Sequence, residues 1–490
     1  MKNIGYLKLA VGNGHYSYDT TTNALIELEE SVHRLLDDYF KHGPAELRER
    51  YLQQLSPEDL SYAVDFIDHA VNECGMFQPY FRKDYSTALD PAYLQELLST
   101  RLSKLVLSVT GHCNQRCTYC QNSQSDAGDR GHRDGNMTWN VAKKSIDYFL
   151  ARRDKDKEIS ISFYGGEPIL KWDLVCQSVH YIQENNHQKN MKIHLVSNAT
   201  LFTDAIIDFL IDNDIYLQIS LDGPRSMHDA ARVVPGGRGT HSKVVGALQR
   251  IRKRNSDYLQ KNVSVNCTFD AKNDIREIFR YFSSEFSDVF VMINAVKTRD
   301  SCHYHISEEN VELHQSRLQN LIDAYLDSLR NNNQFNYRLF HSLFSDIFGS
   351  LSAREIGPAS TEHRPNGACV VGAARLFVTP EGLFYPCERF RPPGYAIGNC
   401  ESGIDVEKVR QLIGTFVGFA MRCAKNAGLI DYASTASYTF WQRGESAKRG
   451  SEKAANSRRQ ELEEPLRDLS ISGKRNHNLA MINGTAYTFK

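Results

Sequence analysis

The stretch LVLSVTGHCNQRCTYC, residues 105–120, decides the fold of this 490-residue chain. Its apolar first part, residues 105–109, predicts a short buried strand. Cys113, Cys117 and Cys120 follow that strand within one loop, so three thiols can reach three corners of a small cluster. Thiolates are soft ligands that suit zinc or iron–sulfur clusters. The sequence therefore predicts a metal centre at the end of this strand.

The loop lacks a fourth protein ligand. A closed structural zinc site requires four ligands, and His112 adjoins the first cysteine too closely to share its metal. A [4Fe–4S] cluster on three thiolates instead leaves one iron open for a small molecule, and we expect that iron to be the active centre. Zinc, or three unrelated buried cysteines, are the alternatives.

A second motif ends a second predicted strand, residues 159–164. It reads Gly165-Gly166-Glu167-Pro168. The two glycines allow a close approach of the backbone to a ligand. Glu167 offers a carboxylate to an ammonium group, and Pro168 fixes the path of the chain as it leaves the turn.

Together, the C-x3-C-x2-C loop and the GGEP turn resemble the radical S-adenosylmethionine (radical SAM) superfamily. The resemblance implies a [4Fe–4S] cluster on Cys113, Cys117 and Cys120, with the methionine end of SAM on the GGEP turn. It also implies reductive cleavage of SAM to a 5′-deoxyadenosyl radical that takes hydrogen from a substrate carbon. No further catalytic residue is assigned.

Strand and helix patterns alternate between residues 101 and 335. Such alternation predicts an α/β fold with a parallel sheet and right-handed crossovers. Six strands are fewer than a closed (β/α)8 barrel has, and the resemblance implies a partial (β/α)6 TIM-like barrel with its site at the carboxyl ends of the strands. The expected strands are 105–109, 159–164, 193–196, 216–221, 263–268 and 289–296. A helix is expected after the N-cap Thr138, and further helices are expected at 171–186, 203–213, 240–254, 273–282 and 308–330.

Polar residues end two further strands of this predicted sheet. Ser197 and Asn198 follow the third strand, and Ser220 and Asp222 follow the fourth. Their hydroxyl, amide and carboxylate groups can hold a ribose or the carboxylate of methionine, so we assign them to cofactor binding. The alternative is that they form turns, for which these residue types are also favoured.

Two more cofactor-binding residues rest on the resemblance. Arg232 matches an arginine that family members often direct at the SAM carboxylate, although a surface salt bridge is the alternative. Tyr119 lies between the last two cysteines of the loop, where its ring can lie against the adenine.

Composition narrows the class of protein. A formal net charge of −1 argues against bulk attraction to nucleic acid or to an anionic membrane. No apolar run approaches the roughly 18 residues of a membrane-spanning helix. Eleven cysteines without a secretion signal indicate reduced thiols. The sequence predicts a cytoplasmic protein, with neither nucleic acid nor membrane as a partner.

Residues 1–100 predict an N-terminal α+β module. A hairpin is expected around Asn13-Gly14, a helix is expected from the apolar spacing that begins at Leu25, and a second helix is expected after the N-cap Ser56. The module either serves packing alone or docks a substrate peptide by strand addition or by a helix in a groove. The docking interpretation depends on the resemblance.

Cysteines also recur in residues 336–425. Cys369 precedes a predicted hairpin that ends in Cys387, and the spacing Cys…Gly-x4-Cys resembles the start of a SPASM domain. That resemblance implies auxiliary [4Fe–4S] clusters, with Cys369, Cys387 and Cys423 as ligands. The isolated residues Cys74, Cys176, Cys267 and Cys302 are instead expected to be small buried hydrophobic groups.

The cysteine pattern stops at Cys423, so the C-terminal domain is expected to be incomplete. Residues 426–490 are rich in charge and lack apolar periodicity, which predicts disorder. We hypothesise that this tail is read in a shifted frame, because its codons can encode a cysteine-dense sequence in another frame.

The flanking regions resemble those of radical SAM maturases of ribosomal peptides. The resemblance implies a precursor peptide that contains cysteine, joined through a thioether or related cross-link, and an electron donor of the flavodoxin or ferredoxin type. One alternative is an anaerobic sulfatase-maturating enzyme that forms formylglycine. Another is an inactive remnant that binds SAM and peptide.

Overall fold

The computed structural model describes residues 5–11, 13–19, 22, 24–78, 90–120, 135–186, 190–270, 272–296, 313, 316–324, 370–388 and 394–415. Cys302, Cys369, Cys423 and the tail 426–490 lie outside the described residues, and so do the predictions made for them.

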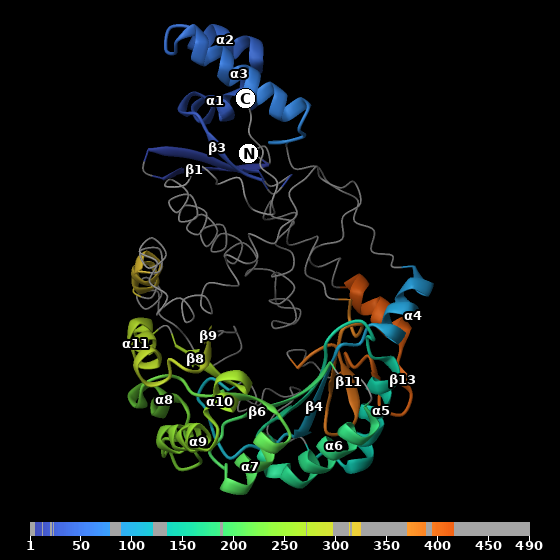
Figure 1. The fold of residues 1–490 in the computed structure, drawn as a ribbon. Helices are drawn as coiled ribbons and strands as arrows, with labels where there is room; N and C mark the ends of the chain where they lie inside the picture. The colour runs from blue at the N-terminus through green and yellow to red at the C-terminus, as the bar shows by residue number, and fades with distance from the viewer. Residues whose placement is uncertain are drawn as a thin grey trace.

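A sheet with the strand order β13-β12-β11-β10-β4-β5-β6-β7-β8-β9 forms the body of the molecule. The six predicted strands are all present, and from β4 to β9 each pairs in parallel with the next. Figure 1 shows them curving into part of a barrel, which confirms the predicted fold class. The strands are β4 (Lys104–Thr110), β5 (Ile159–Gly165), β6 (Met191–Ser197), β7 (Tyr216–Ser220), β8 (Val263–Phe269) and β9 (Phe290–Ala295).

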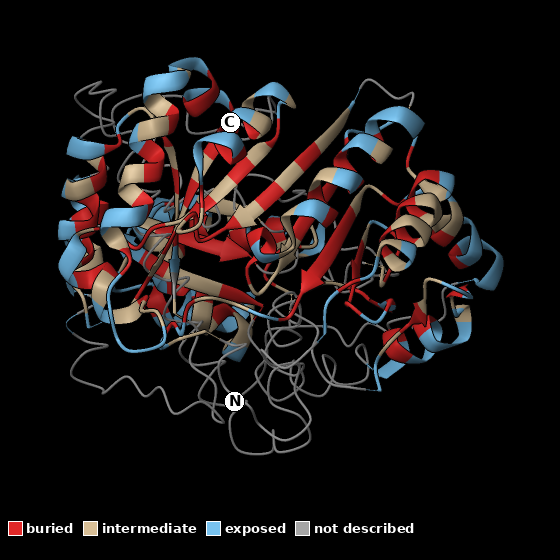
Figure 2. Ribbon diagram, turned by 90° about the horizontal axis from the view of Figure 1, so that it is seen from below, coloured by how far each residue is buried: buried red, intermediate tan, exposed pale blue. Residues whose placement is uncertain are grey.

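Helices cover the outer face of this sheet (Figures 1 and 2). Those that correspond to predicted helices are α5 (Trp139–Arg152), α6 (Trp172–Asn185), α7 (Asp204–Asp212), α9 (His241–Arg254) and α11 (Ile275–Glu285). Of the predicted helix 308–330, residues 313 and 316–324 are described and are helical. Short helices that the sequence did not predict are η1 (Pro168–Lys171), α8 (Arg225–Ala231) and α10 (Ser256–Asn262).

The two faces of the barrel strands differ in polarity. Along β8, the apolar Val263, Val265 and Cys267 are buried, and they alternate with the partly exposed Ser264 and Asn266. Successive residues of a strand point to opposite faces, so the buried residues pack under the helices and the polar ones face the barrel interior. Cys267 is fully buried, as predicted, whereas Cys74 and Cys176 are partly buried.

The C-terminal hairpin belongs to the same sheet, which the sequence did not predict. Strand β10 (Arg375–Val378) pairs in parallel with β4 and antiparallel with β11 (Leu383–Tyr385). The sheet then continues through β12 (Gly398–Asn399) and β13 (Gly403–Ile404). The hairpin itself was predicted correctly.

The cysteine-bearing turns of this region are partly described. Cys387 follows β11 and is partly buried. Cys400, for which the sequence analysis made no prediction, donates its backbone N–H to the Gly382 carbonyl at 2.9 Å. A β-carbon on Gly382 would lie 2.6 Å from Cys400 Sγ, so the turn needs a glycine there. The SPASM interpretation remains a prediction.

The N-terminal module is an antiparallel sheet of β1 (Tyr6–Val11), β2 (Gly14–Asp19) and β3 (Leu25–Leu28), followed by α1 (Glu30–His42), α2 (Pro44–Tyr51) and α3 (Pro57–Asn72). The hairpin is confirmed, and Ser56 caps α3 by accepting the Asp59 N–H at 3.0 Å. The prediction that the helix begins at Leu25 is wrong. Leu25 and Leu28 lie in β3, because pairing with β2 outweighs their helical spacing.

The apolar core is divided into clusters that do not share residues. One packs α1 to α3 on their sheet and reaches Phe77, and another lies between the barrel strands and the helices that cover them and begins at Leu94. Helix α4 (Pro91–Thr100) contributes Leu94 and Leu98 to the barrel cluster. The predicted module 1–100 therefore includes a helix that packs with the barrel. None of the described helices has the length and hydropathy needed to cross a membrane.

Candidate active site

The cysteine loop leaves β4 and is fixed on a segment more than a hundred residues away. Arg116 N–H donates to the Val233 carbonyl at 2.7 Å, and Thr118 N–H donates to the Ala231 carbonyl at 3.0 Å. Ala231 is the last residue of helix α8, and Val233 follows that helix. The loop therefore keeps its shape through backbone hydrogen bonds on either side of Cys117.

The GGEP turn packs directly on the start of the same loop. Gly166 N–H donates to the Thr110 carbonyl and Glu167 N–H donates to the His112 carbonyl, both at 2.8 Å. A β-carbon on Gly165 would lie 2.2 Å from Thr110 O, and one on Gly166 would lie 2.1 Å from His112 O. Both glycines are thus required by the approach of the protein's own backbone.

Replacing Gly166 with alanine is expected to destabilise the chain by roughly 4 kcal/mol or more, because the new methyl group meets backbone that cannot move aside. Gly246 in α9 is the matched control, since a β-carbon there meets nothing within 4 Å. Gly246→Ala should stabilise the protein by about 0.5–1 kcal/mol. Urea unfolding of both variants measures the difference, and equal effects would contradict this account.

Glu167 connects the ends of two strands. Its carboxylate accepts hydrogen bonds from Ser197 Oγ at 2.7 Å, from Asn198 N at 2.8 Å and from Ile169 N at 3.2 Å. The side chain is 1% exposed, and this burial raises its pKa from 4.5 to about 7. The predicted contact of Glu167 with an ammonium group remains a prediction, and the structure shows that Glu167 also positions Ser197 and Asn198.

The raised pKa of Glu167 predicts a pH-dependent stability. The folded chain holds this proton more tightly than the unfolded chain, so the contribution is present below pH 4.5 and is lost as the pH rises to about 7. Relative to Glu167→Gln, the native chain should lose on the order of 3 kcal/mol across that window. Urea unfolding of metal-free protein at several pH values measures this loss, and parallel pH profiles would contradict it.

Two N–H groups lie near the sulfur of Cys113. Gln115 N lies 3.4 Å from it and Asn198 Nδ2 lies 3.9 Å from it. The Asn198 amide is held by Asn114, whose Oδ1 accepts from the same nitrogen at 2.8 Å. These N–H groups suit a sulfur that carries negative charge.

Burial keeps two free thiols of this loop, those of Cys113 and Cys117, neutral. It raises the pKa of Cys113 to about 11 and that of Cys117 to about 12. Bound iron would supply the positive charge that stabilises both as thiolates. The thiols and N–H groups therefore fit an iron–sulfur cluster.

A site for a single ion is not evident in the described ranges, where no group of three or more His, Cys, Asp or Glu side chains could hold a metal ion. The three thiolates of a cluster bind three different iron atoms, so they need not converge on one point.

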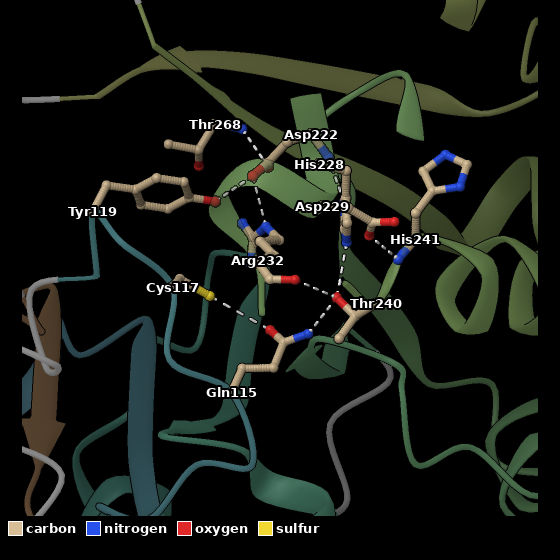
Figure 3. A network of polar contacts seen from close by, with 10 residues as sticks. All are labelled: Gln115, Cys117, Tyr119, Asp222, His228, Asp229, Arg232, Thr240, His241 and Thr268. Carbon is tan, nitrogen blue, oxygen red and sulfur yellow. Dashed lines mark hydrogen bonds and ion pairs between the residues drawn. The ribbon is translucent and has the colours of Figure 1, made fainter. Parts of the chain in front are cut away.

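A second polar network joins the end of β7 to the cysteine loop (Figure 3). Arg232 Nε donates to Asp222 Oδ2 at 2.8 Å, and the Tyr119 hydroxyl donates to the same oxygen. Thr268 N donates to Asp222 Oδ1 at 2.9 Å. The Arg232 guanidinium also lies 5.5 Å from the centroid of the Tyr119 ring.

This ion pair is buried, with Asp222 3% and Arg232 7% exposed, so the surface salt bridge considered for Arg232 is wrong in its location. Tyr119, Asp222 and Arg232, which were all predicted to bind the cofactor, therefore contact one another. Ser220 ends β7 and is partly exposed. Contacts of all four with SAM remain predictions.

Several residues of the site escaped the sequence analysis. They hold the predicted residues in place by hydrogen bonds across the chain, a role without a local sequence signal. Gln115 lies within the cysteine loop, but the spacing of the cysteines gives no indication that Gln115 has a partner beyond α8. The residues are Asn114, Gln115, Thr200, His228 and Thr240.

The family model of the radical SAM superfamily matches residues 107–282, which include the cysteine loop, the GGEP turn and strands β5 to β8. The chain contains a radical SAM domain. The recognition of the superfamily from the two motifs is thereby confirmed. A radical SAM domain uses a [4Fe–4S] cluster and SAM, and the chain is accordingly a radical enzyme.

Similarity to individual relatives covers more of the chain than the family model does. The chain is 27% identical over 308 residues to a cysteine-type anaerobic sulfatase-maturating enzyme of Clostridium perfringens, which covers 61% of this chain and 78% of that protein. It is 22% identical over 301 residues to the radical SAM cyclopropyl synthase TigE of Paramaledivibacter caminithermalis, covering 59% and 58%.

The fold is also shared with a solved structure. The sulfatase-maturating enzyme anSMEcpe with bound AdoMet aligns with a TM-score of 0.58 at 20% identity, over 78% of this chain and 98% of that chain. At this identity the likeness concerns the fold, and it agrees with the partial barrel.

Proposed function

We propose that this radical SAM enzyme acts on a peptide that contains cysteine and joins the cysteine sulfur to a carbon, in a thioether or related cross-link. The observation that supports a cysteine-containing substrate is the 308-residue similarity to an enzyme named as a cysteine-type maturase. TigE, whose name describes a cyclopropyl synthase, supports bond formation as a second outcome within the superfamily.

The residues that would hold the cofactor are Cys113, Cys117 and Cys120, and when it is bound the cluster with SAM supplies a 5′-deoxyadenosyl radical. The protein contributes position and exclusion of water. Asn198 and the backbone of Gln115 place N–H groups at the Cys113 sulfur.

The interior of the barrel is suited to a peptide. Asn294 Nδ2 donates to Asn266 Oδ1 at 2.7 Å, so two carboxamides lie side by side on β8 and β9. Asn266 is partly exposed and Asn294 is exposed. A carboxamide offers both a donor and an acceptor, as a peptide group requires. Polar groups of this kind can hold a peptide backbone near the carboxyl ends of the strands.

The flanking regions complete the proposal. The N-terminal module would dock the peptide at its three-stranded sheet, by strand addition or through its helices. Cys369, Cys387 and Cys423 would hold an auxiliary cluster that accepts the electron released by cross-linking. A flavodoxin or ferredoxin would supply the electron for SAM cleavage in a cytoplasmic setting.

A second candidate is the oxidation of a cysteine to formylglycine. It is favoured by the names of the curated relatives, because cysteine-type anaerobic sulfatase-maturating enzymes from Clostridium perfringens and Clostridium novyi match over 308 residues each. Both candidates begin with removal of hydrogen from a peptide carbon, and they differ in the fate of the sulfur.

Product mass decides between them. The test incubates anaerobically reconstituted full-length protein with SAM, a strong reductant and a cysteine-containing peptide encoded beside its gene. A thioether loses two hydrogens and keeps sulfur: one hydrogen atom goes to 5′-deoxyadenosine, and the other leaves as a proton and an electron. An aldehyde with loss of sulfur indicates formylglycine. No 5′-deoxyadenosine at all would favour the inactive remnant and overturn the proposal.

A further inference from the structure

Gln115 lies between a cysteine of the loop and a buried hydroxyl group (Figure 3). Its carbonyl oxygen Oε1 is 3.5 Å from Cys117 Sγ, and its nitrogen Nε2 donates to Thr240 Oγ1 at 2.8 Å. Gln115 is 2% exposed and Thr240 is 1% exposed. The amide is therefore shielded from water, where its dipole acts strongly on a neighbouring charge.

Thr240 has its hydrogen-bonding capacity fully used. Its hydroxyl donates to the Arg232 carbonyl at 2.9 Å and lies 3.0 Å from His228 Nε2. The Asp222 backbone N–H donates to His228 Nδ1 at 3.2 Å, so the ring hydrogen is on Nε2 and points to Thr240. Burial lowers the pKa of His228 to about 4, consistent with this neutral ring.

A hydroxyl has one hydrogen to donate and two acceptor sites. In Thr240, Arg232 takes the hydrogen, and His228 and Gln115 take the acceptor sites. The hydroxyl has no hydrogen left for a reversed Gln115 amide. The amide must therefore present its NH2 group to Thr240 and its carbonyl oxygen to Cys117.

We propose that Thr240 fixes the Gln115 amide with its carbonyl oxygen toward Cys117, and that this orientation lowers the reduction potential of the cluster bound there. A partial negative charge beside a ligand sulfur opposes an added electron, whereas an N–H donor favours it. Gln115 and Thr240 are positioning residues. The inference depends on the cluster and not on the peptide or the bond formed.

An EPR-monitored redox titration of reconstituted full-length protein, without SAM or peptide, tests the proposal. Thr240→Val removes the hydroxyl and lets the amide turn its NH2 group to the sulfur. The potential should rise by about 59 mV, which is tenfold in a one-electron equilibrium constant. Thr240→Ser keeps the hydroxyl and should keep the native potential. The signal is assigned by its loss in Cys117→Ala, and iron content is measured for every variant.

A second pair of variants guards against a folding defect in Thr240→Val. Gln115→Met removes the dipole and should raise the potential. Gln115→Glu is kept protonated by burial, donates its hydroxyl hydrogen to Thr240 and keeps its carbonyl oxygen toward the sulfur, so the potential should stay near the native value. Equal potentials in Thr240→Val and Thr240→Ser, a lowered potential in Thr240→Val, or equal rises in the two Gln115 variants would overturn the proposal.

Discussion

Cys117→Ala is expected to reduce 5′-deoxyadenosine formation to background and to lower the iron content of anaerobically reconstituted protein. Cys117 is the most buried thiol of the loop, at 8% exposed, and backbone bonds from Arg116 and Thr118 fix it on both sides. A cluster with two remaining thiolates has lost the ligand set that a radical SAM domain requires. Chromatography of the nucleoside and iron quantitation measure the two effects.

The matched control is Cys176→Ala. Cys176 is partly buried and lies in α6, away from the loop. This variant should cleave SAM at the native rate and keep the native iron content. Native cleavage by Cys117→Ala, or zinc in place of iron in the native protein, would contradict the assignment of the cluster.

Arg232→Met is expected to destabilise the chain by about 3–5 kcal/mol, because it leaves the buried Asp222 carboxylate without its positive partner. Arg232→Met combined with Asp222→Asn should recover much of that loss, since the amide carries no charge. Urea unfolding of metal-free protein measures stability separately from SAM binding.

Arg254 provides the control for this buried pair. It forms a more exposed ion pair with Asp208 at 2.7 Å, so Arg254→Met should cost less than about 1 kcal/mol. If Arg232→Met costs no more than Arg254→Met, Arg232 is not needed for the fold. Its role would then be limited to the predicted contact with SAM.

The barrel and the two motifs at the centre of the site could be predicted from the sequence. Strands such as β8 combine buried apolar residues with a strict alternation, and the cysteine loop and GGEP turn carry fixed local spacings. The spacing of Cys113, Cys117 and Cys120 needs no knowledge of distant contacts. Local signals of this kind can be read from one sequence.

Features that depend on distant pairing could not be predicted. Leu25 and Leu28 have helical spacing, yet β2 recruits them into a strand. Thr240 serves His228, Gln115 and Arg232 at once: Gln115 comes from the cysteine loop, whereas His228 and Arg232 come from α8 and its C-terminal end. A threonine with three partners has the same sequence signal as a threonine in an ordinary loop.

The parallel pairing of β10 with β4 has a consequence for any shortened version of this protein. A chain that ends at residue 282, where the family match ends, would lack β10. One edge of β4, the strand that precedes the cysteine loop, would then be unpaired along Val106 and Leu107 and could pair with other chains. A mutation in the gene that changes only residues after 415 would leave the pairing of β10 with β4 intact. Polypeptides that end before β10 should therefore aggregate, whereas those that end after β13 should remain in solution.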